Sequence, residues 1–165
     1  MAVAEIIGAA VGVLILIIVA YIVVGSTLSA AETVSNAQKD LTLQHESRLQ
    51  TSFVITDKDK NGPIINISIT NTGTEVIRDF SHMVIFTHTI GDSQGYRNLN
   101  YEKMTCGIEG TWCIRDELGI VPDTIHPNQL DPGEKMYIMA TSPSGTSPDW
   151  CQITTGNGVY ATAYL

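Results

Sequence analysis

The chain has 165 residues, of which 17 are Asp or Glu and 9 are Lys or Arg, so its formal net charge is -8 at neutral pH. An acidic surface repels nucleic acid, and the sequence has no basic stripe interleaved with aromatic residues, which excludes a nucleic-acid-binding protein. This length accommodates one long helix and one domain of ordinary size.

The N-terminal segment is strongly apolar. The first 31 residues contain one side chain that is charged at neutral pH, Glu5, and the 19 residues from Ile6 to Val24 carry no charge. About 20 apolar residues in a helix span the hydrocarbon core of a bilayer. Fourteen of the 19 residues are Ile, Val, Leu or Tyr, and their removal from water is worth roughly 25–30 kcal/mol as an upper figure. The apolar residues surround the helix, so packing one face on a domain is not enough. Either lipid or a bundle of identical helices from other subunits could surround this segment.

Small residues near the start of this segment would let neighbouring helices approach closely; they are Gly8, Ala9, Ala10 and Gly12. A plain membrane anchor accounts for them equally well. A secretory signal opens with basic residues and closes with a small-residue cleavage site, and the segment has neither pattern. We therefore expect an already processed N-terminus.

Residues 26–50 continue with apolar residues at roughly helical spacing, and no proline occurs before Pro63. This pattern predicts one continuous helix to about residue 49, on the order of 65 Å long. We assign residues 1–49 to this helix, with residues 6–24 as its hydrophobic core.

The remaining residues, 50–165, are predicted to form an all-β immunoglobulin-like sandwich of about seven short antiparallel strands. Five runs rich in β-branched or aromatic residues are bounded by turn residues; they cover 52–57, 64–70, 76–89, 135–141 and 159–165. The predicted fold class is therefore α+β, with a long N-terminal hydrophobic α-helix followed by the sandwich.

Five stretches of this sequence resemble a known group of proteins: IIGAAVGVLILIIVAYIVVGSTLSA (6–30), ETVSNAQKDLTLQHESRL (32–49), ITNTG (69–73), LDPGEKMYIMAT (130–141) and NGVYATAYL (157–165). They are similar to the archaellins and archaellum accessory proteins of the type IV pilin superfamily. The resemblance implies a leader removed by a prepilin-type peptidase, and subunits that leave the membrane to form an extracellular helical filament. Helices would form the filament core and sandwiches its wall, and a motor driven by an ATPase would rotate the filament.

The same resemblance implies a polymerisation core on the helix, formed by Met1, Glu5, Ile6, Ile7, Val11, Leu14, Ile15, Ile18, Tyr21 and Ile22. In such a filament the Glu5 carboxylate would meet the α-amino group of a neighbouring subunit's Met1, because a buried charge needs a partner. The alternative is that Glu5 interacts favourably with the dipole of its own helix.

Three cysteines, Cys106, Cys113 and Cys151, indicate an oxidising exterior. They contain no Cys-x-x-Cys pair, and their spacing does not suit zinc. Cys106 and Cys113 bracket a loop of six residues, so we favour a disulfide between them, with a bridge from Cys151 to either one as the alternative. The remaining thiol is either buried, which we favour, or linked to another subunit.

Two weaker motifs lie in the first predicted hairpin. Residues 57–62 (DKDKNG) match the start of an EF-hand calcium loop, but the twelfth position is Ser68 instead of Glu. An acidic hairpin turn is the favoured interpretation, and calcium is the alternative. Asn66-Ile67-Ser68 is a sequon for N-linked glycosylation in a secreted protein, which makes Asn66 a glycosylation candidate.

Catalytic motifs are missing from the sequence, which has no Gly-x-Ser-x-Gly element, P-loop or metal-binding pair. Of the four histidines, His82 and His88 are predicted to be ordinary residues on one face of one strand. We therefore expect no enzyme, no cofactor, and no catalytic, cofactor-binding or metal site.

The function implied by the resemblance is a structural subunit of an extracellular archaellum filament used for swimming. The alternatives are an adhesive type IV pilus subunit and a membrane-anchored, stator-like archaellum accessory that binds the cell-surface layer. The implied partners are other copies of the chain, the peptidase, the membrane during assembly and, indirectly, the archaellum motor and assembly ATPase.

Overall fold

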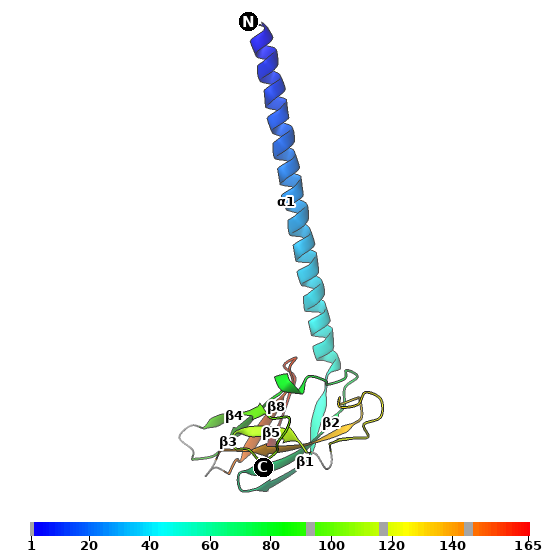
Figure 1. Cartoon of the computed structure of the whole chain (residues 1–165), viewed down its shortest axis with the longest axis vertical. Coiled ribbons are helices and arrows are strands. Elements are labelled where there is room, and N and C mark those ends of the chain that lie inside the picture. Colours follow the sequence, from blue (N-terminus) through cyan, green and yellow to red (C-terminus); the bar gives the residue numbers. More distant parts are fainter. Residues whose placement is uncertain (1, 92–94, 116–118, 144–146) are drawn as a thin grey trace. The chain divides into compact units, whose positions relative to one another are not determined.

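The computed structural model describes residues 2–91, 95–115, 119–143 and 147–165. It contains one α-helix, α1 (Ala2–Gln50), followed by β-strands (Figure 1). The helix continues through Gly25 without a break and ends one residue beyond the predicted position. The chain divides into two compact units, Met1–Gln44 and His45–Leu165, so the last turn of α1 belongs to the β-rich unit.

The C-terminal end of α1 is tied to the loop that follows β2. The backbone N–H groups of Thr74 and Glu75 donate to the Gln50 carbonyl oxygen at 2.9 and 3.2 Å. Free carbonyl groups at a helix end need such partners. Gly73 makes this close approach possible, because a Cβ atom there would lie 2.3 Å from the Gln50 oxygen and 2.5 Å from the Ser52 nitrogen.

The β-rich unit is a sandwich of two sheets. We call the first sheet I; its strands are β1 (Phe53–Asn61), β2 (Ile64–Asn71), β7 (Lys135–Thr141) and β5 (Thr111–Ile114), with β6 (Ile120–Val121) also pairing with β7. The second is sheet II; its strands are β4 (Tyr96–Tyr101), β3 (Val84–His88), β8 (Trp150–Thr154) and β9 (Tyr160–Tyr164).

A short parallel pairing of β4 with β5 joins the two sheets, with Asn100 opposite Thr111 and Tyr101 opposite Trp112. The other strand pairs in the described ranges are antiparallel. At the far edges, the Lys58 ammonium group on β1 donates to the Tyr164 carbonyl oxygen on β9. Contacts of this kind nearly close the sandwich into a barrel.

The sandwich core consists of the inward-facing residues of both sheets. Alternation along β7 shows the pattern, because Met136, Ile138 and Ala140 are buried while the residues between them are half-buried. Successive residues of a strand point to opposite faces, so every second side chain enters the core. The largest fully buried side chains include Trp112, Ile65, Ile67, Ile69, Ile85, Leu99, Leu130, Met136, Ile138 and Ile153.

The predicted strand over residues 76–89 is wrong before Val84. Ile77 forms an isolated bridge with Leu130, and Phe80–His82 is the short 3-10 helix η1. Phe80 and Met83 are both buried three residues apart, a spacing that fits one helical turn rather than an alternating strand. Consequently His82 on η1 and His88 on β3 do not lie on one strand, and the prediction that placed them together is wrong.

Candidate functional site

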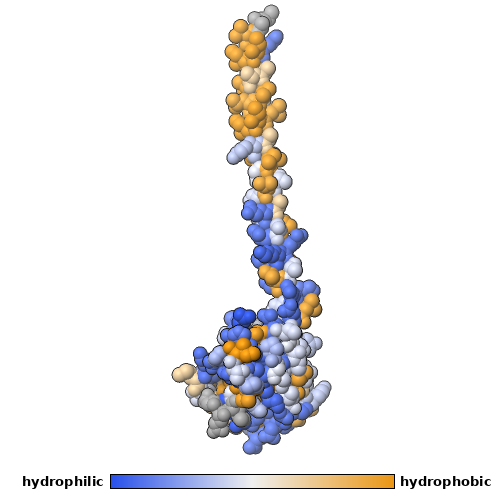
Figure 2. All heavy atoms as spheres, turned by 90° about the vertical axis from the view of Figure 1, so that its right-hand side faces the viewer, coloured by the Kyte–Doolittle hydropathy of each residue, from blue (hydrophilic) through white to orange (hydrophobic). Residues whose placement is uncertain are grey.

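The apolar segment Ile6–Val24 is exposed on every side of α1. Its large hydrophobic residues are between 49% (Ile18) and 81% (Tyr21) accessible. Figure 2 shows mostly apolar side chains along the N-terminal half of α1 and more polar ones along the rest. This helix is long and apolar enough to cross a membrane. Nineteen residues rise about 29 Å, close to the thickness of a bilayer's hydrocarbon core of about 30 Å.

Eight of the predicted polymerisation-core residues lie in this segment; Glu5 lies directly before it, and Met1 is outside the described residues. The other nine are all exposed on the helix: Glu5, Ile6, Ile7, Val11, Leu14, Ile15, Ile18, Tyr21 and Ile22. A Cβ atom at Gly8 or Gly12 would meet nothing within 4 Å, so no contact inside the chain requires glycine there.

Hydroxyl groups mark the end of the apolar segment. Ser26 Oγ and Thr27 Oγ1 donate to the Val23 carbonyl oxygen at 3.0 and 2.7 Å. Such bonds to the preceding turn satisfy the hydroxyl without water. The first charged side chain after the segment is Glu32. The helix therefore changes from apolar to polar over about two turns.

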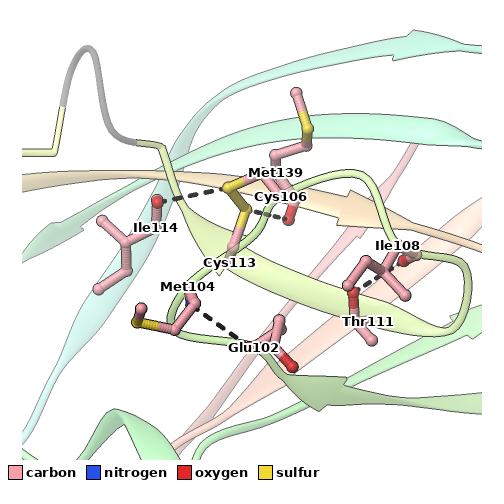
Figure 3. The surroundings of a disulfide bond; sticks show 8 residues. All are labelled: Glu102, Met104, Cys106, Ile108, Thr111, Cys113, Ile114 and Met139. Atoms are coloured by element: carbon pink, nitrogen blue, oxygen red, sulfur yellow. Dashed lines mark hydrogen bonds between the residues drawn. A yellow bond between two sulfur atoms is a disulfide. The ribbon is translucent and has the colours of Figure 1, made fainter.

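The structure contains the disulfide favoured from the sequence, between Cys106 and Cys113 (Figure 3). Their Cα atoms are 5.4 Å apart. Cys113 lies on β5, and its Sγ is 3.6 Å from the Met139 carbonyl oxygen of the neighbouring strand β7. On the same loop, Thr111 Oγ1 donates to the Ile108 carbonyl oxygen at 2.7 Å. The bridge thus fastens the loop between β4 and β5 to sheet I.

The third cysteine, Cys151, is a free thiol with no accessible surface, at an inward-facing position of β8. Burial, the largest cause, raises the pKa of this thiol to about 11. A thiolate is the reactive form, so the thiol is both inaccessible and unreactive near neutral pH. This agrees with the favoured prediction of burial and not with an intersubunit link.

Residues 57–61 form the second half of β1 and pair with β2 after a register shift between Ile55 and Asp57, so they do not have the geometry of an EF-hand loop. The two-residue turn after them is Gly62-Pro63, and Gly62 has a φ of +61°, as the tight turns of β-hairpins often require. This agrees with the favoured interpretation, a hairpin turn. The Asp57 carboxylate accepts hydrogen bonds from Lys135 Nζ and Ser68 Oγ, both at 2.9 Å. The hydrogen bond from Lys135 is the largest cause that lowers the pKa of Asp57.

The glycosylation candidate Asn66 lies in the middle of β2, a strand paired on both sides. Its side chain is half-buried, and its Oδ1 atom is buried without a hydrogen-bond partner among the described residues. Whether it carries a glycan stays a prediction.

Two of the four histidines contact carboxylates within their own loops. His82 Nδ1 is 2.6 Å from Asp79 Oδ2, and His126 Nδ1 is 2.7 Å from Asp131 Oδ1. Over the described part of the chain, no group of three or more His, Cys, Asp or Glu side chains could hold a metal ion.

An open cleft of about 740 Å³, which we did not predict from the sequence, is lined by residues of η1, of the ends of β4 and β5, and of β6 with the loop after it. Three basic residues line it: Arg78, Lys103 and Arg115. They are far apart in the sequence, so no local pattern indicates the cleft. Residues 116–118, next to Arg115, are outside the described residues.

No protein-family model and no curated protein matches the chain. Among solved structures, the archaellum periplasmic stator protein FlaG from Sulfolobus acidocaldarius is similar with a TM-score of 0.48 and 18% identity, over 70% of this chain and 99% of that one. A chain of the FlaF–FlaG stator complex from the same organism is similar with a TM-score of 0.48 and 18% identity, over 68% and 87% of the two chains. Similarity at this level assigns neither a role nor a partner to the chain.

Proposed function

We propose that the chain is a membrane-anchored structural protein of the cell surface, whose β-sandwich works outside the cytoplasm as a stationary, non-catalytic module. The observation that carries this proposal is the uncharged segment Ile6–Val24, exposed on all sides of α1 over about one bilayer thickness. An apolar surface of this extent is stable only where water is excluded.

The length and the charge of the chain favour lipid over a filament of copies as the surroundings of this segment. Its apolar length matches one bilayer, and the hydroxyl groups of Ser26 and Thr27 follow directly where an interface would lie. The net charge of -8 makes closely packed copies repel each other. Separate anchored molecules avoid that repulsion.

The disulfide supports an exterior position for the sandwich. A bond such as Cys106–Cys113 persists in oxidising compartments and is rare in a reducing cytosol. The chain would then cross the membrane once, with the residues after Val24 outside.

Within this class we infer an accessory role in an archaellum, the role that the two similar structures carry in their names as archaellum periplasmic stator proteins. The proposal itself is supported by the helix and the sandwich of this chain. A stator must resist torque without turning. Within the β-rich unit, the Gln50 carbonyl oxygen accepts bonds from Thr74 and Glu75, which hold the last turn of α1 to the sandwich.

A filament subunit, of an archaellum or an adhesive pilus, is the second candidate. It is favoured by the small residues Gly8 and Gly12, which no contact inside the chain requires. It is also favoured by Glu5, which has neither a hydrogen bond nor an ion pair to any residue that the structure describes. Both features would be explained by close packing against other copies of α1.

Fractionation of cells that produce the chain separates the two candidates. Surface fibres are sheared off, imaged by negative-stain microscopy and analysed by mass spectrometry, and the washed membranes are analysed in parallel. We expect the chain in the membranes and only traces in the fibres. Fibres built from this chain would overturn the anchor and establish the filament. If the chain is the proposed anchored accessory, deletion of its gene should leave the fibres in place but stop or weaken swimming.

A further inference from the structure

The outward face of sheet II differs from the rest of the sandwich in its chemistry. Directly opposed residues of neighbouring strands share a face, so the register defines it. One row across the four strands consists of Tyr96, His88, Trp150 and Tyr164. The next row consists of Asn98, Phe86, Gln152 and Thr162, and a third contains Val84, Thr154 and Tyr160. We call these residues the sheet II face.

None of these residues is Asp, Glu, Lys or Arg, although the chain has 26 such residues in all (17 acidic and 9 basic). The outward face of sheet I provides the contrast, because there Asp57 pairs with Lys135 at 2.9 Å. Charges do lie at the edges of the sheet II face, where Asp149 pairs with Lys60 at 3.6 Å and the Lys58 ammonium group donates to the Tyr164 carbonyl oxygen. A surface that lacks charge within so acidic a protein suits an uncharged partner.

Aromatic rings are concentrated at one end of the sheet II face and are exposed. Tyr96 is 68% accessible and Tyr164 is 76% accessible. The Tyr96 ring is nevertheless held in place, with its centroid 4.6 Å from that of His88 and 5.9 Å from that of Trp150, the latter edge to face. Tyr96 and Tyr164 lie on the two outer strands of four, about 14 Å apart at the usual strand spacing. An exposed ring held in place, like that of Tyr96, is prepared to receive a ligand.

Polar groups on the same face are free to bond a ligand. Among the described residues, the side chains of Asn98 and Thr162 have no hydrogen-bond partner, and the Gln152 amide donates only to Thr154 Oγ1, at 3.1 Å. These amides and hydroxyls supply both donors and acceptors. They lie one row from the aromatic residues, about 7 Å along each strand.

We propose that the sheet II face binds an uncharged glycan of the cell surface. A sugar ring presents apolar C–H groups on its faces and hydroxyl groups around its edge. The negatively polarised face of an aromatic ring attracts the C–H groups, while amides and hydroxyls bond the edge. The combination of exposed Tyr96 and Tyr164 with free Asn98 and Thr162 supplies both requirements on one flat surface. The inference uses the proposed function only to place the sandwich outside the cell.

The size of the face favours a glycan over a folded protein. Four strands and five residues along each strand cover about 200–300 Å². A stable protein interface buries about 800 Å² on each partner, so a protein would have to extend well onto charged surface around this face. A glycan chain that crosses the strands from Tyr96 to Tyr164 needs only the uncharged area.

The test measures binding of neutral hexasaccharides of glucose, N-acetylglucosamine, mannose and xylose to the full chain in lipid nanodiscs by isothermal titration calorimetry. Nanodiscs avoid glucoside and maltoside detergents, which would compete as sugars. Fluorescence gives a second readout, since Trp112 is fully buried and Trp150 lies on the face. We expect at least one hexasaccharide to bind and to change Trp150 emission. Tyr96→Ala and Tyr164→Ala should each weaken binding roughly 3- to 10-fold.

Tyr137→Ala is the matched control, because Tyr137 is a half-buried tyrosine on the outward face of sheet I, 5.8 Å from Lys135 Nζ. It should leave affinity unchanged, and circular dichroism checks that each variant is folded. Three results would overturn the proposal: no neutral hexasaccharide binds, Tyr137→Ala weakens binding as much as Tyr96→Ala, or the Tyr96→Ala chain binds normally. Analytical ultracentrifugation tests a second copy as the partner. If the chain forms dimers that Tyr96→Ala dissociates, and no sugar binds, the face belongs to a dimer interface instead. Fractionation of cells that produce the same variants shows whether the chain is in the membrane, so a failure of sugar binding can be told apart from a failure of the proposed membrane anchor.

Discussion

Two aspartates in the middle of the apolar segment should release the chain from the membrane. Ile15 and Ile18 lie near the centre of Ile6–Val24 and are 54% and 49% accessible in the chain itself. Neither side chain supports the sandwich, which belongs to the other compact unit. Replacing them therefore tests what surrounds the helix and leaves the fold of the β-rich unit unchanged.

The free-energy cost of these aspartates can be compared with the insertion free energy of the segment. It contains 13 Ile, Val and Leu residues, each worth about 0.3–0.6 kcal/mol of insertion free energy, or roughly 4–8 kcal/mol together. An aspartate at the helix centre costs about 2.5–3.5 kcal/mol and also forfeits the contribution of the isoleucine it replaces. Ile15→Asp should thus cost about 3–4 kcal/mol. The double variant should cost about 6–8 kcal/mol, which cancels the whole favourable term.

Alkaline carbonate extraction of membranes measures the outcome. We expect the original chain to stay in the pellet, Ile15→Asp to divide between pellet and supernatant, and the double variant to appear in the supernatant. A matched double variant, Leu28→Asp with Leu41→Asp, adds the same charge to exposed positions beyond the segment and should stay in the pellet. A double Ile15→Asp, Ile18→Asp chain that resists extraction would refute the reasoning.

Three further predictions concern the sandwich. Gly73→Ala should lower the free energy of unfolding by about 1–3 kcal/mol in urea titrations, because its Cβ would lie 2.3 Å from the Gln50 oxygen. Cys151, with no accessible surface and a pKa raised to about 11, should not react with a maleimide at pH 7 in the folded chain and should react fully in denaturant. The pKa of buried Asp131 is lowered below its ordinary 3.8, mainly by the hydrogen bond from His126. The ionised carboxylate therefore stabilises the fold above pH 3.8, and this contribution is lost as the pH falls through the lowered pKa. Asp131→Asn should make stability, measured by urea titration between pH 2 and 7, less dependent on pH.

Gly73→Ala has a matched control, and each of the three predictions has a result that would contradict it. Gly8→Ala, at a position where a Cβ meets nothing within 4 Å, should leave the sandwich as stable as before. Equal stability of Gly73→Ala would mean that the loop moves aside without cost. Rapid maleimide labelling of the folded chain would contradict the buried position of Cys151. An unchanged acid slope in Asp131→Asn would contradict its lowered pKa.

The sequence predicts the parts of the fold that depend on local pattern. An uncharged run, followed by apolar residues at helical spacing without proline, predicts α1 nearly to its last residue, and alternation in 64–70 predicts β2. The hairpin before β2 is also predicted, but its turn residues are Gly62 and Pro63, and Asn61, expected at the tip, is the last residue of β1. The favoured disulfide is also the observed one, because only a short loop separates Cys106 from Cys113.

What the sequence does not predict depends on distant contacts. β4 and β5 are short, and they become strands by pairing with each other and with β3 and β7. The 3-10 turn at Phe80 is set by burial of Phe80 and Met83 against the core, which overrides their strand propensity. The aromatic row of sheet II brings together residues from four strands. Only the register shows that Tyr96 and Tyr164 share a face.

The central claim, that α1 lies in lipid while the sandwich lies outside, is tested most directly by labelling introduced cysteines on intact cells with a membrane-impermeant maleimide. Background is low because the native cysteines are either bridged or buried. Ile125→Cys, at a position 70% accessible on the sandwich, should be labelled on intact cells. Leu14→Cys, within the apolar segment, should be labelled only after detergent is added. Labelling of Ile125→Cys only after lysis, or of Leu14→Cys on intact cells, would contradict the account.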